Sequence, residues 1–264
     1  MTAQWRDLGY SEPPDVGAAT AEYDSFAAAL EASGASLEWL PGDKELTLDS
    51  IYVRDAACVC SKGLILAQMG KPARSGEPGT TEAYARAAGI PIAGRIEGEA
   101  RLEGGDVAWV DDRSVAVGIG YRSNFEGARQ LREILGDLVD EVFEVHLPHH
   151  HGPQDVFHLM SVFSPVAERM AAVYSPLLPV VFRQWLRGRG YGFVEVPNGE
   201  FESMACNILA VQPGRCVMLD ENPDTLAALE HAGVEVTTYS GHEISRKGEG
   251  GPTCLTLPIG RDAG

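Results

Sequence analysis

The stretch GEGGPTCLTLP, residues 248–258, contains a cysteine between a glycine-rich turn and a short apolar run. Glycines in this turn let the backbone bend and let another molecule approach without meeting a Cβ atom. Pro252 stiffens the approach to Cys254, and Leu255–Leu257 is predicted to be a short β-strand. A thiol presented in this way is either a small buried hydrophobe or a nucleophile. The pattern of the remaining chain distinguishes these two roles.

Composition limits the class of protein. The 264 residues, of which 44% are hydrophobic, are enough for one large domain, so we expect a single domain over residues 1–264. The net charge of −17 argues against nucleic acid as a partner, because nucleic acid binding needs clustered lysine and arginine. The N-terminus is polar, no apolar run is long enough for a membrane span, and the five cysteines are odd in number and scattered. We therefore predict a cytoplasmic protein without contact with a membrane.

Helices and strands are predicted in a repeating order. Residues 1–20 are expected to be an arm or lid loop, and five repeats are expected at about 21–78, 79–125, 126–178, 179–222 and 223–264. Each repeat begins with a helix, and the predicted helices are 21–34, 81–89, 127–136, 180–190 and 225–233. A strand (35–41 after the first helix), a second strand and usually a hairpin partner are predicted to follow each helix. A period of about this length predicts a stacked or closed repeat architecture.

The second strand of each repeat is predicted to carry one polar or reactive side chain. In chain order these side chains belong to Asp55, Glu103, His158, Asn207 and Cys254, at separations of 48, 55, 49 and 47 residues. If the repeats close around an axis, equivalent positions converge on that axis, as they do in a propeller. Two carboxylates, an imidazole, an amide and a thiol would then share one central cavity. The spacing therefore favours a nucleophilic role for the thiol.

Five motifs in this order resemble the guanidino-group-modifying, or pentein, superfamily. They are YVRD (52–55), LEGGDV (102–107), GYRSNFEGARQL (120–131), FHLMSVFSPV (157–166) and GGPTCLTLP (250–258). The chain is most similar to the dimethylarginine dimethylaminohydrolase branch. The resemblance implies a five-bladed α/β propeller with a cysteine, a histidine and two carboxylates at the axis. Two departures are Met160, where deiminases usually carry an acid, and the lack of a clear strand within residues 1–20.

The chemistry of a guanidinium matches the converging side chains. Asp55 and Glu103 are expected to bind and orient the cation through charge-assisted hydrogen bonds. Cys254 is the expected nucleophile, and His158 is expected to protonate the leaving nitrogen and then to activate water. The resemblance implies a hydrolase that cleaves a C–N bond of arginine or N-methylated arginine. Citrulline and an amine would be released through a covalent thiouronium intermediate.

Several residues have both a functional and a structural interpretation. The resemblance implies that Arg122 and Arg74 grip the α-carboxylate of a substrate, but both could equally be solvated loop cations. Asn207 is expected to contact substrate or only to cap the central strands. Asp106 could support Glu103 or His158, or cap a turn. Arg54 is expected to point to the opposite face from Asp55.

We predict neither metal nor cofactor. The run His149–His151 is expected to be a solvated loop or lid segment, because three adjacent histidines do not by themselves provide ligand geometry. The expected partner is a small guanidino compound, and a homodimer is left open. The alternatives are an amidinotransferase or arginine deiminase-like enzyme with the same intermediate, and a propeller that binds a partner without catalysis.

Overall fold

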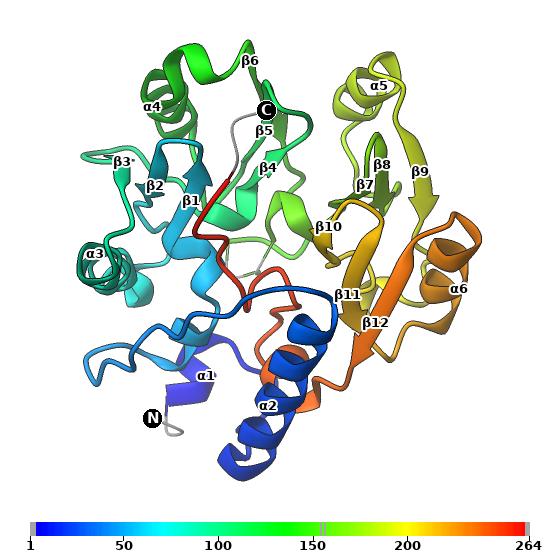
Figure 1. The fold of residues 1–264 in the computed structure, drawn as a ribbon, viewed down its shortest axis with the longest axis horizontal. Coiled ribbons are helices and arrows are strands. Elements are labelled where there is room, and N and C mark those ends of the chain that lie inside the picture. The colour runs from blue at the N-terminus through cyan, green and yellow to red at the C-terminus, as the bar shows by residue number, and fades with distance from the viewer. Residues whose placement is uncertain (1–3, 154, 156, 262–264) are drawn as a thin grey trace. The chain divides into compact units, whose positions relative to one another are not determined.

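The computed structural model describes residues 4–153, 155 and 157–261, which divide into two compact units (Figure 1). The first unit combines the residues up to Glu38 with Met160–Thr253, and the second combines Trp39–Leu159 with the residues from Cys254 onward. The prediction of a single domain stays a prediction. Each unit is described by itself below.

One ββαβ motif occurs four times in the part of the chain that the structure describes. Two strands form an antiparallel hairpin, a helix follows, and a third strand pairs in parallel with the second, so that each motif makes a three-stranded sheet. In the second unit the elements are β1 Ala57–Cys60, β2 Gly63–Leu66, α3 Glu77–Ala88, β3 Ile92–Arg95, β4 Val107–Trp109, β5 Ser114–Ile119, α4 Phe125–Leu135 and β6 Glu141–His146. In the first unit they are β7 Phe163–Ala167, β8 Met170–Val173, α5 Val180–Gly188, β9 Gly192–Glu195, β10 Leu209–Gln212, β11 Arg215–Leu219, α6 Pro223–His231 and β12 Glu235–Tyr239.

Hydrophobic burial explains these elements. In the second unit one core cluster joins residues of the β1–β3 sheet, such as Ile65, to residues of the β4–β6 sheet, such as Val115 and Val117. The middle strand β5 is buried along its whole length, which explains its nearly continuous apolar sequence. Asn124 caps α4 by accepting a hydrogen bond from the amide of Gly127 at 2.9 Å. The turn between β5 and α4 is thereby fixed.

Two further helices belong to the first unit: α1 Trp5–Leu8 and α2 Val16–Ala32. The side chain of Asp15 caps α2, and the ring of Phe26 packs on Tyr239 of β12 at 4.6 Å between centroids. The prediction of a loop over residues 1–20 is thus wrong in part, because α1 lies within this segment and α2 begins at Val16. None of the helices in the described part of the chain has the length and apolar character that a bilayer span requires.

Two predicted strands are absent from the described residues. Leu255–Leu257 forms no strand, and neither does the segment 35–41. The side chain of Leu255 is buried and Leu257 packs on the β1–β3 core, so the alternating pattern there reflects burial without strand pairing. In segment 35–41 Trp39 is exposed. The described residues form four small sheets and no closed sheet, and they do not confirm a five-bladed propeller.

Candidate active site

Asp55, Glu103, His158 and Asn207 lie shortly before the first strand of a sheet, and not on the strand as predicted. Asp55 belongs to a 3₁₀ turn, Val53–Ala56, that leads into β1. Glu103 directly precedes the 3₁₀ turn Gly104–Asp106 that leads into β4. His158 directly precedes the turn Leu159–Ser161, and Asn207 lies two residues before β10. The spacing found in the sequence is therefore that of these turns.

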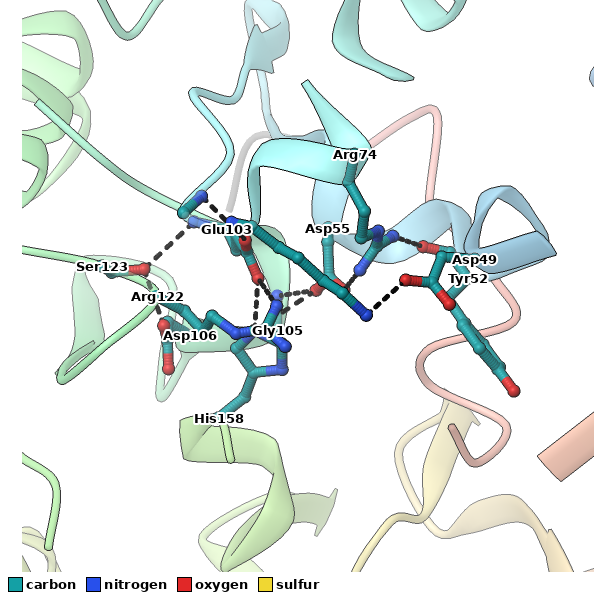
Figure 2. Close-up of polar contacts among 12 residues, drawn as sticks. Asp49, Tyr52, Asp55, Arg74, Glu103, Gly105, Asp106, Arg122, Ser123 and His158 are labelled. Atoms are coloured by element: carbon teal, nitrogen blue, oxygen red, sulfur yellow. Dashed lines mark hydrogen bonds and ion pairs between the residues drawn. The ribbon is translucent and has the colours of Figure 1, made fainter. Parts of the chain in front are cut away.

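The second unit brings Asp55, Glu103 and His158 together (Figure 2). Glu103 is fully buried, and its Oε2 lies 2.7 Å from Nε2 of His158, which is 3% exposed. The other carboxylate oxygen, Oε1, accepts hydrogen bonds from the backbone amides of Gly70 and Lys71 at 2.8 and 3.2 Å. Such a pair is held in one geometry by the fold around it.

Asp55 is the second carboxylate of this cluster. Its Oδ1 lies 3.9 Å from Nε2 of His158 and accepts a hydrogen bond from the amide of Gly105 at 2.9 Å. Its Oδ2 accepts a hydrogen bond from Nη1 of Arg74 at 2.6 Å. Asp55 and Glu103 therefore both face the imidazole.

The charges of these groups determine the protonation of His158. Burial alone would lower the pKa of His158, but the carboxylates of Asp55, Asp106 and Glu103 outweigh burial and raise it to about 9. For Glu103 burial acts in the opposite direction and would raise the pKa. Its hydrogen bond to His158 and the nearby cations nevertheless keep this pKa below its ordinary value. At neutral pH the pair is therefore imidazolium and carboxylate. His158 carries a proton that it can donate.

Two arginines supply positive charge to the same carboxylates. Arg122 donates from Nη1 to Oε2 of Glu103 at 3.0 Å. Arg74 is buried, and besides Asp55 it contacts both carboxylate oxygens of Glu77, at 2.7 and 2.8 Å, and the carbonyl oxygen of Tyr52. Neither arginine is a solvated loop cation. Their predicted role in gripping an α-carboxylate stays a prediction.

Cys254 lies in a turn, Pro252–Leu255, and is partly exposed. Its carbonyl oxygen accepts a hydrogen bond from the backbone amide of Arg54 at 3.1 Å, so it lies beside the residue that precedes Asp55. The guanidinium of Arg54 donates to the hydroxyl of Thr256 at 3.3 Å. Burial lowers the pKa of Arg54 to about 10, although Cys254 opposes this change by charge. Arg54 therefore ties the cysteine segment to the turn that carries Asp55.

Asn207 holds the residue that precedes the cysteine. In the first unit its side-chain oxygen accepts hydrogen bonds from the amide and the hydroxyl of Thr253, at 3.0 and 2.7 Å. A Cβ atom at Gly251 would lie 2.6 Å from Cγ of Asn207, so glycine is needed for this close approach. These contacts give Asn207 a structural role, and direct contact with substrate stays a prediction.

Two histidines of the run 149–151 contact nearby polar side chains, those of Tyr121 and Asp155. The hydroxyl of Tyr121 lies 2.7 Å from Nδ1 of His149, and Nδ1 of His150 lies 3.0 Å from a carboxylate oxygen of Asp155. His149 and His151 are exposed. These contacts agree with a solvated loop; a lid function stays a prediction.

A metal ion is a second possible occupant of the buried cluster. Asp55, Glu103 and His158 each offer a donor atom within 4.8 Å of the others. Arg74 and Arg122 already pair with these two carboxylates, and their charge opposes any further cation there. The prediction that no metal is required stays a prediction.

Some members of the site were not found from the sequence. They include the backbone amides of Gly70 and Lys71, the Ser123 hydroxyl, and the ion pair of Lys71 with Asp49 at 2.7 Å. One signal was available for the arginines, because Asp55 with Arg74 and Glu103 with Arg122 share the same separation of 19 residues. A repeated carboxylate–arginine spacing predicts the same ion pair in successive repeats.

Gly105 provides a direct test of how closely the cluster is packed. A Cβ atom at this position would lie 2.8 Å from Oδ1 of Asp55 and 2.9 Å from Cγ and Nδ1 of His158. We expect Gly105→Ala to lower kcat/KM for a guanidino substrate by about 10²-fold, since a displacement of about 1 Å can cost that much. Gly79→Ala is the matched control, because nothing lies within 4 Å of its added Cβ and it belongs to α3. Equal activity of the two variants would contradict this packing.

The chain is similar to known proteins along most of its length. The family model described as arginine deiminase matches residues 48–180 and 165–261. The YkgA protein of Bacillus subtilis is 26% identical over 211 residues, covering 80% of this chain and 70% of that protein. The arginine deiminase of Listeria welshimeri is 25% identical over 253 residues and covers 80% of this chain. This chain spans 61% of the length of that deiminase.

Solved structures show the same fold. The dimethylarginine dimethylaminohydrolase of Pseudomonas aeruginosa, solved as a mutant complexed with citrulline, superimposes with a TM-score of 0.80 at 25% identity, covering 96% of this chain and 94% of the other. The N-terminal domain of ArgZ, an arginine dihydrolase from cyanobacteria, gives a TM-score of 0.86 at 19% identity over 98% and 92% of the two chains. From the family match over most of its length, we conclude that this chain belongs to the arginine deiminase family, within the pentein superfamily.

Proposed function

We propose that this protein is a cysteine-dependent hydrolase that cleaves a C–N bond of arginine or an N-methylated arginine. Asp55 and Glu103 bind the guanidinium, Cys254 is the nucleophile and His158 transfers protons. The products are citrulline and ammonia or an alkylamine.

One observation carries this proposal. Both buried carboxylates already bind guanidinium groups, because Asp55 pairs with Arg74 and Glu103 pairs with Arg122. The pairs are short and almost completely buried, a setting in which charge-assisted hydrogen bonds are strong. Between them lies an imidazole that is protonated at neutral pH. A site of this kind can hold a guanidinium and give a proton to one of its nitrogens.

The first half of the reaction forms a covalent intermediate. The Cys254 thiolate attacks the central carbon of the guanidinium, and the C=N electron pair moves to nitrogen to give a tetrahedral adduct. His158 donates its proton to the leaving nitrogen, and the C–N bond breaks with its electron pair on the amine. The carbon remains bound to sulfur as a thiouronium. Asp55 and Glu103 stabilise the positive charge of this group.

The second half releases the product. The neutral imidazole of His158 takes a proton from water, and the oxygen attacks the thiouronium carbon. The C–S bond breaks with its electron pair on sulfur, which restores the thiolate, and the oxygen-bound proton is lost to give a ureido group. One water is consumed and one amine is released, so the cycle needs no other reactant.

The substrate class has two candidates, and a specific observation favours each. The family model and the Listeria welshimeri relative concern arginine deiminases, which favours arginine itself. The dimethylarginine dimethylaminohydrolase match at 25% identity favours methylated arginine. Met160, two residues after His158, takes the place of the acid that deiminases usually carry and also favours methylated arginine.

The test is a panel of guanidino compounds: arginine, Nω-methylarginine, asymmetric dimethylarginine and agmatine. We expect formation of a ureido product from one of the first three, with equal release of ammonia or alkylamine and with oxygen from ¹⁸O-labelled water in the product. Turnover that needs an added amine acceptor would instead identify an amidinotransferase. No turnover of any member of the panel would refute the proposal.

Covalent labelling separates an enzyme from a binding propeller. A thiol-directed haloamidine is expected to label Cys254 selectively among the five cysteines, with intact mass and peptide mapping as the readout. Burial raises the pKa of Cys216 to about 12, which keeps that thiol unreactive. Labelling without preference would favour a protein that binds a partner without catalysis.

We further propose the closed five-bladed arrangement that the sequence predicts. Four ββαβ motifs in the described residues support it, as does the placement of Asp55, Glu103, His158 and Asn207 shortly before a first strand. A crystal structure of the chain tests this arrangement, and light scattering tests the homodimer that the sequence leaves open.

A further inference from the structure

Asp106 is a buried carboxylate next to the Glu103–His158 pair, and the mechanism above does not use it. It is 1% exposed and ends the 3₁₀ turn Gly104–Asp106. Its Oδ1 accepts a hydrogen bond from the backbone amide of Leu159 at 2.9 Å. Its Oδ2 accepts a hydrogen bond from the hydroxyl of Ser123 at 2.6 Å. Both carboxylate oxygens therefore have a defined partner.

The Leu159 amide and the Ser123 hydroxyl connect Asp106 to His158 and to Glu103. Leu159 directly follows His158, so its amide fixes the backbone from which the imidazole extends. The Ser123 hydroxyl, which donates to Asp106, also accepts a hydrogen bond from the amide of Glu103 at 3.0 Å. Figure 2 shows the connected path from Asp106 through Ser123 to Glu103. One carboxylate is thus linked to the backbone of the acid and of the histidine.

The space around the Asp106 carboxylate is tightly filled. A Cβ atom at Gly118 of β5 would lie 2.4 Å from Oδ1 of Asp106 and 3.0 Å from its Cγ. Glycine in the middle of a buried strand is unfavourable by itself, and it often marks close approach of another group. Here that group is the Asp106 side chain.

Asp106 also contributes charge to the surroundings of His158. The imidazole is influenced by three carboxylates, Asp55, Asp106 and Glu103. Arg74 and Arg122 offset two of them through direct ion pairs. Burial raises the pKa of Asp106 to about 6, so above this pH its negative charge adds to that of the other two. It therefore supports the protonated form of His158 in the neutral range.

We propose that Asp106 is a positioning residue for the reaction, which fixes the Glu103–His158 pair through the Leu159 amide and the Ser123 hydroxyl. The proposal rests on the proposed function. Asp106 acts through the backbone and the hydroxyl of its neighbours, so its contribution is to geometry and to the proton affinity of His158.

The main test is Asp106→Asn, which keeps the size of the side chain and one oxygen that can accept from Leu159. We expect kcat to fall by about 10–100-fold, a part of the 10²–10⁴ that general acid–base catalysis contributes, with KM changed by less than about 3-fold. The basic limb of the pH profile of kcat is expected to move to lower pH, because one of three carboxylates that favour the imidazolium has lost its charge. Ser123→Ala should show a smaller fall in kcat, because it removes one link only.

Glu200→Gln is the matched control. Glu200 is also a buried carboxylate that accepts hydrogen bonds from backbone amides, those of Asp224 and Thr225, but it lies in the first unit. It should change stability without moving the pH profile. If Asp106→Asn matches Glu200→Gln in kcat and in pH profile, the proposal is wrong. If Asp106→Asn does not fold, an unchanged kcat in Ser123→Ala overturns the proposal.

A second readout separates this inference from the proposed function. NMR titration of the His158 imidazole in the wild-type protein and in Asp106→Asn requires no substrate. We expect a lower pKa for His158 in the variant. If no guanidino compound is turned over but His158 shifts, the proposed function fails and the positioning role of Asp106 toward His158 stands. If turnover is present and His158 titrates identically in both proteins, the inference about Asp106 fails alone.

Discussion

Cys254→Ser is expected to abolish turnover while binding of a guanidino compound is retained. The nucleophile acts mainly in the transition state, so its loss should lower kcat by more than about 10³-fold. A serine hydroxyl has a far higher pKa than a thiol, and His158, which is already protonated at neutral pH, cannot serve as the base that would activate it. Asp55 and Glu103 remain in place, so the Kd for arginine should change by less than about 3-fold. Calorimetry together with a turnover assay checks both values.

Cys216→Ser is the control for this variant. Cys216 is buried in the first unit and its thiol contacts the carbonyl oxygen of Val166 at 3.5 Å, a contact that a hydroxyl can keep. It should retain wild-type turnover. A Cys254→Ser protein that turned over at near the wild-type rate would show that another group is the nucleophile.

Glu103→Gln is expected to weaken both binding and catalysis. The substitution removes one of the two negative charges that face the guanidinium, and such charge-assisted hydrogen bonds are worth about 1.5–3 kcal/mol each. The Kd is therefore expected to rise by about 10–100-fold. His158 loses its partner at 2.7 Å, so kcat should fall by about 10²–10⁴-fold as proton transfer is impaired. Binding that equals that of the wild type would contradict the role assigned to Glu103.

The same variant has a signature in the pH dependence of stability. The pKa of His158 is raised from its ordinary 6.5 to about 9 in the folded protein. Its contribution to stability is therefore complete below pH 6.5 and is lost as the pH rises through about 9. In Glu103→Gln the pKa of His158 should be lower, so this loss should occur at lower pH. Urea unfolding between about pH 6 and pH 10 measures the difference, with Glu200→Gln as the control.

Much of the fold follows from sequence pattern. Helix periodicity and turn residues predict α3, α4, α5 and α6 in the right places, and alternating or continuous apolar runs predict the hairpins of all four sheets. Leu255–Leu257 shows the limit of this reasoning. Its apolar residues are buried, but a strand also requires a partner for its backbone, and pattern reports burial only.

The clustering of Asp55, Glu103 and His158 was predicted from the sequence, whereas the ion pairs of Arg74 and Arg122 were not, and the catalytic roles stay predictions. The regular spacing of Asp55, Glu103 and His158 predicted the cluster, because equivalent turns in successive motifs present equivalent side chains. A long flexible side chain such as that of Arg122 can reach outward or inward, and sequence spacing gives its origin but not its direction. The backbone amides that hold Glu103 carry no side-chain signal at all.

The ion pair of Arg122 with Glu103 makes ligand binding a competition. An incoming guanidinium that bonds to Oε2 of Glu103 meets an oxygen that already accepts from the protein's own guanidinium at 3.0 Å. The charge of Arg122 therefore opposes the ligand and offsets part of its attraction to Glu103. Because Glu103 is buried, added salt should screen both effects only weakly. Guanidino compounds carry the same charge, so discrimination between them must come from contacts with the rest of the substrate.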